Sequence, residues 1–180
     1  MKTFNLQEKR ILHVGPNKSE YDYVLKMINP AVYDRVALSK NEIVNLPKDI
    51  AKNSLKQEYY DLVIIWHVLE HIKDDVKAIK NLFSSLRYGG KILVSVPIHP
   101  KGNSKTIEDD KIDEKEYEKI YGDRHHVRSC GLDYIERFIN AGFQLIYDVN
   151  VKNINPKKIE YFGLSINHIA WICEKSEIKV

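Results

Sequence analysis

The stretch YDLVIIWHVLEHIKDDVKAIKNLFSSLRYGGKILVSVPI, residues 60–98, determines which fold the sequence can adopt. Residues 60–68 and 91–98 are continuous apolar runs, which are typical of strands buried on both faces of a sheet. Between them, residues 74–86 repeat apolar side chains at helical spacing. The sequence YGG at 88–90 is expected to end that helix with a glycine in the left-handed conformation. A strand, a helix and a second strand in this order predict a parallel crossover unit.

The same alternation continues on both sides of this stretch. Further strands are expected at 10–14, 32–38, 42–46, 143–151 and 166–175, and further helices at 19–28 and 131–142. Ser19 is expected to cap the first of these helices, with Asp22 as its capping-box partner. The last two strands have no helix between them, so we expect them to pair antiparallel at one edge. The sequence therefore predicts an α/β, Rossmann-like sheet that is mostly parallel, with an antiparallel last strand and helices on both faces. The ligand cleft is expected where the first and fourth strands end.

Length and composition limit the classes of protein that the chain can belong to. The 180 residues, of which 43% are hydrophobic and 29% charged, suit a single domain over residues 1–180. A formal charge of +3, with both signs interleaved, gives no indication of nucleic-acid binding. No apolar run is long enough for a membrane helix. Two cysteines without a CxxC motif favour a cytoplasmic protein. The composition leaves the oligomeric state open.

Three blocks of the sequence resemble one known family. Residues 60–98 are similar to the class I S-adenosylmethionine-dependent methyltransferases, in the small branch whose core reads FDLV…HVLEH…LRPGG…VP. GDRHHVRSCGLDYIERFINAGF, residues 122–143, resembles that branch's G-x-DHVR-x-YG-x-D segment. RILHVGPN, residues 10–17, resembles its variant motif I, RILHFAPE. The resemblance covers residues 10–175 and implies a seven-strand sheet, with S-adenosylmethionine as the cofactor.

The resemblance assigns the first turn of the chain to the cofactor. Ordinary members have an acid followed by G-x-G-x-G there, so that the backbone approaches the cofactor closely and helix amides receive its carboxylate. In this sequence His13 stands in place of the acid, and Gly15 keeps the first glycine. Asn17 and Ser19 replace the other two. Asn tolerates left-handed geometry and Ser can cap a helix, so the turn remains feasible.

Two further positions are expected near the nucleoside part of the cofactor. The acid that normally ends the second strand is missing, because its position falls near Ala37. Glu42, in EIVNLP, matches the family's DITDLP and is expected near the adenine or the ribose. Trp66 could pack under the adenine, although a large apolar side chain at this position also suits the core.

The sequence HVLEH contains His67, Glu70 and His71. It formally matches the inverted zinc-protease pattern, which would imply metal-dependent hydrolysis. That pattern needs both histidines on one helix, whereas His67 ends an apolar strand, so we expect no metal ligands here. The structural interpretation of Glu70 and His71 is that they satisfy backbone amides at a loop–helix junction. Because His67 follows the fourth strand, it is expected to face the cleft as a cofactor contact and a catalytic base.

The sequence DRHHVR, residues 123–128, is the second candidate for catalysis. His126 could act as a base, and Arg128 could hold an acidic group of the substrate. The alternative is that Arg128 pairs with the acidic stretch at 108–116 and that the histidines are solvated. Residues 99–129 are expected to form a substrate lid with a short helix around 114–121, or else a charged loop.

These observations lead to two main hypotheses. The first is a methyltransferase for a small polar or anionic acceptor, such as a sugar hydroxyl, with His67 and His126 as candidate bases and Arg128 as the substrate anchor. The second is a non-catalytic binding or partner protein, on the same fold, whose cofactor loop is degenerate. The partner in the first case is a small molecule.

Overall fold

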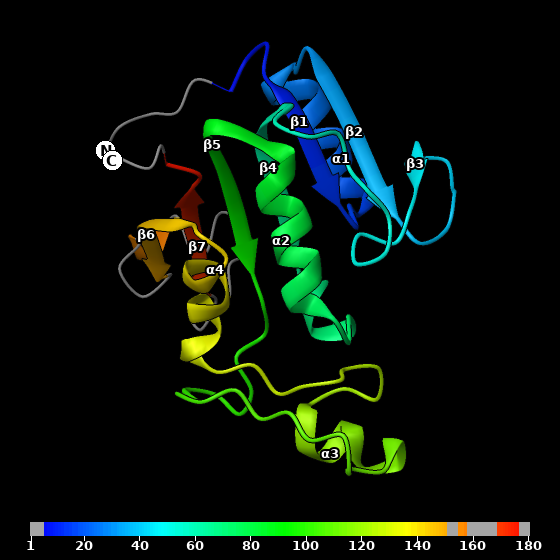
Figure 1. Ribbon diagram of the computed structural model, residues 1–180, viewed down its shortest axis with the longest axis vertical. Helices are drawn as coiled ribbons and strands as arrows, with labels where there is room; N and C mark the ends of the chain where they lie inside the picture. The colour runs from blue at the N-terminus through cyan, green and yellow to red at the C-terminus, as the bar shows by residue number, and fades with distance from the viewer. Residues whose placement is uncertain (1–5, 151–154, 158–168, 177–180) are drawn as a thin grey trace.

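A computed structural model of the chain describes residues 6–150, 155–157 and 169–176. It contains a seven-stranded sheet in the order β3-β2-β1-β4-β5-β7-β6 (Figure 1). The strands are β1 (Arg10–Val14), β2 (Val32–Ala37), β3 (Leu46–Pro47), β4 (Tyr60–Trp66), β5 (Leu86–Ser95), β6 (Gln144–Asn150) and β7 (Ile169–Glu174). All pairs from β3 to β5 are parallel, and β7 runs antiparallel to both β5 and β6. The predicted fold class and the antiparallel last strand are confirmed.

Short helices connect the strands. They are α1 (Lys18–Tyr23), the π-helix η1 (Val24–Ile28), the 3-10 helix η2 (Leu69–His71), α2 (Asp75–Ser85), the 3-10 helix η3 (Glu114–Glu116), α3 (Tyr117–Tyr121), the 3-10 helix η4 (Leu132–Ile135) and α4 (Glu136–Asn140). The helix predicted around 114–121 is therefore present as η3 and α3. The outer residues of the strands predicted at 143–151 and 166–175 lie outside the described part of the chain.

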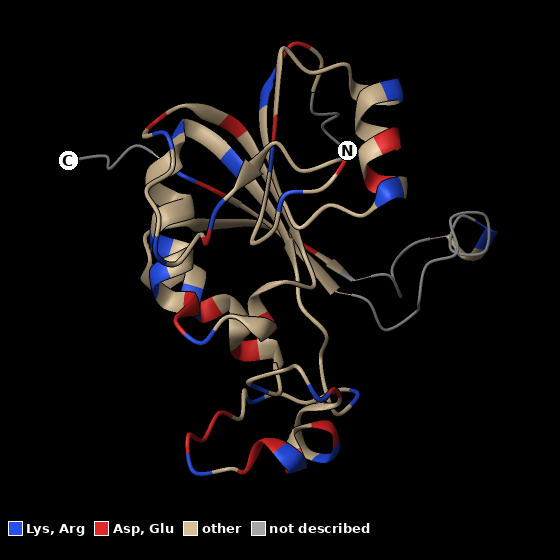
Figure 2. Ribbon diagram, turned by 90° about the vertical axis from the view of Figure 1, so that its right-hand side faces the viewer, with Lys and Arg blue, Asp and Glu red and all other residues tan. Residues whose placement is uncertain are grey.

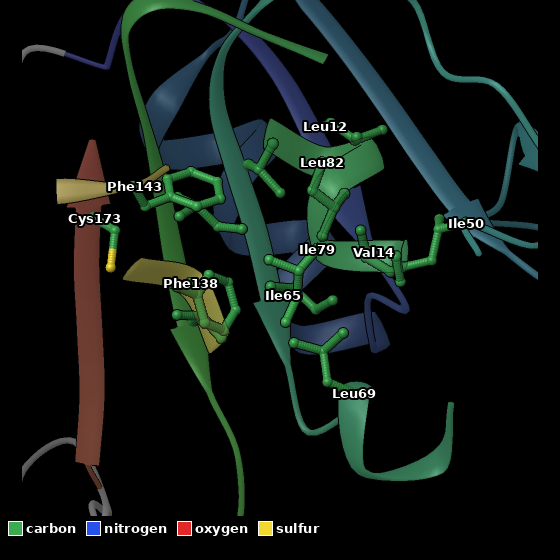
Figure 3. Packing of buried hydrophobic residues seen from close by; sticks show 14 of the residues in the cluster. Leu12, Val14, Ile50, Ile65, Leu69, Ile79, Leu82, Phe138, Phe143 and Cys173 are labelled. Carbon is green, nitrogen blue, oxygen red and sulfur yellow. The ribbon is translucent and has the colours of Figure 1, made fainter. Parts of the chain in front are cut away.

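Successive side chains of the central strands point to opposite faces of the sheet, and each face packs against helices. On one face, Leu12 and Ile65 join the large core with residues of α2 and α4 (Figure 3). On the other face, Ile11 and Ile64 pack with Val24 of η1 in a smaller cluster. The helices on both faces that the sequence predicted are thus confirmed. The central strands form continuous apolar runs because helices cover both faces of the sheet.

Two local predictions about helix ends are wrong. Asn17, not Ser19, is the N-cap of α1, and its capping-box partner is Glu20, not Asp22. The cap lies two residues earlier than predicted because α1 already begins at Lys18. The helix α2 ends at an extended Leu86, so the glycines of 88–90 belong to β5 and do not cap the helix.

The strand predicted at 42–46 is also shorter than expected. Only Leu46 and Pro47 pair with β2, as β3. Asn41 explains part of this difference, since its side chain accepts hydrogen bonds from the amides of Ile43 and Val44 and holds them in a turn.

Residues 99–129 extend beyond the carboxyl ends of the parallel strands (Figure 1). The segment carries many charged side chains of both signs (Figure 2). An isolated bridge between Ile98 and Cys130 joins the residues that flank the segment, and a second bridge, between Ile107 and Ser129, lies within it. This position is compatible with a substrate lid, which stays a prediction. Among the described helices, none combines the length and the apolar character that crossing a bilayer requires.

Candidate functional site

A cavity of about 820 Å³ opens where the parallel strands end. Its size lies within the range of about 300–1,000 Å³ that is typical of small-molecule sites. The residues after β1, β2 and β4 all contribute to its lining, among them Gly15, Leu38, Asn41, Asp49, Val68 and His71. The cavity therefore lies at the carboxyl edge of the sheet, where ligands bind in open α/β folds.

Gly15 lets the chain turn tightly between β1 and α1. Its φ angle is +62°, and a Cβ atom built there would lie 2.8 Å from the Cγ2 atom of Val68. Its amide donates to the carbonyl of Val36, which ties the turn to β2. A residue with a side chain would be strained and would collide with Val68. The Gly15 turn therefore lies against Val68, the residue that follows His67.

The first turn of α1 is fixed by a capping box. The Asn17 Oδ1 atom accepts from the Glu20 amide at 2.9 Å, and the Glu20 Oε2 atom accepts from the Asn17 amide at 3.0 Å. Ser19 lies exposed in the same turn. The arrangement brings the carboxylate of Glu20 to the start of the helix, a position where negative charge is favourable.

His13 does not reach the cavity. It is buried and lies on the sheet face that packs against η1, where its Nδ1 atom is 2.9 Å from the hydroxyl of Tyr33. Its Nε2 atom is 3.5 Å from the Oε2 atom of Glu20. Burial raises the pKa of Glu20, but hydrogen bonds from His13 and from the Asn17 amide, with the charges of His13 and His67, outweigh burial and lower it. Glu20 therefore places a carboxylate beside the position where the family's acid is replaced by histidine.

The two expected nucleoside contacts lie apart from the cavity lining. Trp66 is partly buried and packs against the smaller core cluster, which favours the core interpretation. Glu42 is exposed. Its neighbour Asn41 lines the cavity instead, as does Asp49, whose pKa is lowered by the hydrogen bond from the Ala51 amide. Sequence reasoning missed Asn41 and Asp49 because neither occupies a motif position.

His67 is held in an unusual backbone conformation at the end of β4. Its φ angle is +49°, although it is not a glycine, and its amide donates to the carbonyl of Ser95. The side chain is 40% exposed, and its Nδ1 atom lies 3.6 Å from the Oε1 atom of Glu70. Backbone strain of this kind persists where the surrounding structure enforces it, and it is often found at functional sites.

His126 approaches the same oxygen of Glu70. Its ring is 13% exposed, and its Nε2 atom is 4.0 Å from the Glu70 Oε1 atom. It packs edge-on against His71, with 4.8 Å between the ring centroids. The segment is held there by the amide of Val127, which donates to the carbonyl of Glu70. The structure thus brings HVLEH and DRHHVR together, although the two motifs are far apart in the sequence.

The side chain of Arg128 makes its contacts in the interior of the protein. This side chain is buried, and its Nη1 atom donates to the carbonyls of Leu69 and Ile72, at 2.7 Å each. Its Nη2 atom donates to the carbonyl of Lys73 and to the carboxylate of Glu108. The pairing with Glu108 agrees with the structural alternative for this residue. Arg128 fixes η2 and the loop after it, and thereby positions Glu70 and His71.

Comparison with known proteins agrees with this geometry. A family model described as a methyltransferase domain matches residues 4–147. No protein with a curated function is significantly similar in sequence. An S-adenosylmethionine-dependent methyltransferase from Mesorhizobium loti has a similar structure, with a TM-score of 0.69, 12% identity, and coverage of 96% of this chain and 93% of that one.

Two similar structures contain bound ligands. The 1,6-didemethyltoxoflavin-N1-methyltransferase of Burkholderia thailandensis, bound to 1,6-didemethyltoxoflavin and S-adenosylhomocysteine, has a TM-score of 0.65 and 14% identity over 95% of this chain and 72% of that one. Phosphoethanolamine N-methyltransferase 2 of Haemonchus contortus, bound to S-adenosyl-L-methionine, has a TM-score of 0.63 and 15% identity over 95% and 49%. At these identities the likeness concerns the fold.

Proposed function

The chain belongs to the methyltransferase domain family, and on this premise we propose that it transfers a methyl group from S-adenosylmethionine to a small polar or anionic acceptor, such as a sugar hydroxyl. The observation that carries the proposal is the cavity of about 820 Å³ at the carboxyl edge of the sheet, with the Gly15 turn on its wall. Family membership supports the reaction, and the cavity supports a small-molecule ligand.

The residues around the Gly15 turn fit the amino-acid end of the cofactor. A Cβ atom at Gly15 would lie 2.8 Å from Val68, so only a glycine lets the turn approach Val68 this closely. The amides of Lys18 and Ser19, which the capping box does not use, suit a carboxylate. Glu20 suits the ammonium group, because its carboxylate lies beside His13, which replaces the usual acid. When bound, S-adenosylmethionine supplies a methyl group on a positively charged sulfur, which a nucleophile can attack.

The charges around the cavity suit an acceptor that is polar or anionic. Lysines outnumber acids among the lining residues; the lysines are Lys48, Lys52, Lys73 and Lys77, and the acids are Asp49 and Asp74. A surplus of positive charge attracts phosphate or carboxylate groups. Residues 99–129 lie beyond the same edge of the sheet and are proposed to cover the bound acceptor.

His67 and His126 are the proposed bases. Methyl transfer to a hydroxyl needs a group that removes its proton, and an imidazole can do so at neutral pH. His67 is strained and its side chain is 40% exposed, whereas that of His126 is 13% exposed. The more accessible of the two bases is therefore His67. Alignment of the acceptor accounts for the rest of the catalysis.

Thermal unfolding with S-adenosylhomocysteine tests the proposal. A ligand at about 100 times its dissociation constant adds about 2.7 kcal/mol to the free energy of unfolding, which raises the melting temperature. Adenosine, which lacks the amino-acid end, should have a smaller effect. No shift at millimolar S-adenosylhomocysteine would contradict the proposal and favour a non-catalytic scaffold. With binding shown, transfer of labelled methyl groups to sugars, sugar phosphates and small acids would identify the acceptor.

A further inference from the structure

Glu70, His71 and His126 form a cluster that the proposed reaction does not explain. One ligand atom from each residue lies within 4.8 Å of the other two. We propose that these residues bind a divalent transition metal ion of the zinc type, at the edge of the cavity. The inference departs from the expectation that this motif holds no metal ligands, and it involves a different constellation from that of the proteases, since His126 replaces the first histidine of HxxEH.

In both His71 and His126, the hydrogen bond of the ring leaves the Nε2 atom available to bind a metal ion. The Nδ1 atom of His71 lies 3.1 Å from the carbonyl oxygen of His125, and the Nδ1 atom of His126 lies 3.1 Å from that of Tyr121. A carbonyl oxygen can only accept, so each Nδ1 must carry the proton, which leaves the Nε2 lone pair available in a neutral ring. Backbone carbonyls commonly orient metal-binding histidines in this way.

The two Nε2 atoms face a carboxylate. They lie 3.9 Å and 4.0 Å from the Oε1 atom of Glu70, too far for a hydrogen bond. In the neutral rings, lone pairs of three acceptor atoms would converge with no hydrogen between them. The Nδ1 atom of His67, which lies 3.6 Å from the same Oε1 atom, is also too far for a hydrogen bond. Such an arrangement needs a positive charge at its centre, which a metal ion supplies.

Glu70 carries a second, independent indication. The residue is only 1% exposed, yet its Oε2 atom has no hydrogen-bond partner among the described residues. Buried carboxylates are normally paired or bound to metal. The loop that holds Glu70 is tied down by Arg128, which binds the carbonyls of Leu69 and Ile72. The carboxylate is therefore kept in a buried position where a cation would satisfy it.

The ligand atoms favour zinc or a similar ion over magnesium. Imidazole suits zinc, iron and nickel, whereas magnesium prefers oxygen ligands in octahedral geometry. Zinc bonds to nitrogen and oxygen are about 2.0–2.2 Å long, so two ligands of one ion are at most about 4.2 Å apart. The distances of 3.9 Å and 4.0 Å from Glu70 to the histidines fit within this limit. All three ligand atoms lie within 4.8 Å of one another, so a small turn of the exposed His71 ring would bring the two Nε2 atoms to the separation that one ion requires.

Three protein ligands leave a coordination position open, as in catalytic zinc sites. His71 also lines the cavity, so the open position would be reached from there. This step rests on the proposed function: a hydroxyl oxygen of the acceptor is the chemical group that suits the position, because a metal ion lowers the pKa of a bound oxygen.

Calorimetric titration of the chelator-treated chain with zinc chloride tests the site, without cofactor or acceptor. We expect one equivalent to bind and to raise the melting temperature. Glu70→Gln, His71→Asn and His126→Asn should each weaken binding at least tenfold. His125→Asn is the matched control, since it changes an exposed histidine next to His126 but keeps the carbonyl that orients His71. It should bind like the unchanged chain.

Cobalt(II) provides a second measurement that does not depend on stability. Its visible absorption should show nitrogen and oxygen ligands in the unchanged chain and should change in His71→Asn and His126→Asn. If Glu70→Gln fails to fold, judged by circular dichroism, the two histidine variants decide the matter. Binding of less than one equivalent by the unchanged chain, or binding by both histidine variants as tight as that of the unchanged chain, would overturn the site. Either result leaves the S-adenosylhomocysteine titration unaffected, so the two proposals fail separately.

Discussion

The Oε2 atom of Glu20 lies 3.5 Å from the Nε2 atom of His13, although the two residues belong to different elements on either side of the Gly15 turn. The helix α1 therefore places the carboxylate of Glu20 beside His13, the residue of β1 that stands where the family has an acid. The capping box with Asn17 holds this carboxylate in position. A loop that is degenerate in sequence thus keeps a negative charge in space.

Replacing Glu20 with Gln tests this compensation. Gln can still cap the helix, so α1 should remain folded while the charge is lost. We expect the affinity for S-adenosylhomocysteine to fall about fivefold, since a partly exposed charge interaction contributes about 1 kcal/mol. Calorimetric titration measures the change. Asp22→Asn, on the same helix, should leave the affinity unchanged, and equal affinities of both variants would contradict the role of Glu20.

Gly15→Ala should weaken both the fold and the cofactor site. The new Cβ atom would lie 2.8 Å from Val68 at a φ angle of +62°. Gly89→Ala is the matched control, because Gly89 also has a positive φ angle but no atom within 4 Å of the built Cβ atom. Gly89→Ala should lose about 1 kcal/mol of unfolding free energy from backbone strain alone. Gly15→Ala should lose more, with at least tenfold weaker S-adenosylhomocysteine binding; losses of equal size would show that the contact with Val68 is unimportant.

The variant His67→Gly should lower activity without lowering stability. Glycine relieves the positive φ angle of His67, so the unfolding free energy should stay equal or rise by about 1 kcal/mol. Turnover should fall about 100-fold, the usual contribution of a general base. Glu8→Gly relieves a similar φ angle away from the cavity and should leave turnover unchanged. Urea unfolding and methyl-transfer rates measure the two effects. Undiminished turnover in His67→Gly would remove His67 from the catalytic residues.

The central part of the fold could be predicted because its pattern is local. The apolar runs of β4 and β5 and the helix between them follow from spacing within one stretch of sequence. The ends of helices and strands were harder to predict, since they depend on single hydrogen bonds. The pattern Asn17-x-x-Glu20 is itself a capping-box signal, so the correct start of α1 was available in the sequence.

The site was only partly predictable, because its contacts join distant segments. Gly15 was found from a local motif. The burial of Arg128 was not, since its partner carbonyls on Leu69 and Ile72 lie more than fifty residues earlier. The convergence of His71 and His126 on Glu70 likewise depends on the folding of residues 99–129 against η2. No spacing rule within one motif could indicate it.

Arg128→Lys distinguishes the structural role from the substrate anchor. Lysine keeps the charge, but its three donor hydrogens cannot replace the bonds that Arg128 makes to three carbonyls and a carboxylate. We expect a loss of about 3 kcal/mol in unfolding free energy, as for other buried charges deprived of partners. The KM of the folded fraction should change little. Arg124→Lys, at an exposed position of the same motif, should affect neither quantity. A large increase in KM at unchanged stability would instead restore the anchor.

Glu108 should make stability depend on pH. Burial raises its pKa, but hydrogen bonds from Arg128 and Arg137 outweigh burial and lower it below the unfolded value. The stabilisation is therefore fully present above the unfolded pKa, about 4.3, and is lost as pH falls through the lower folded value. Urea unfolding from neutral to acid pH should show this decline. It should be smaller in Glu108→Gln, which is less stable at neutral pH because both arginines lose a partner. Glu114→Gln, at an exposed acid of the same segment, should follow the unchanged chain, and an equal decline in all three proteins would show that the ion pairs contribute nothing.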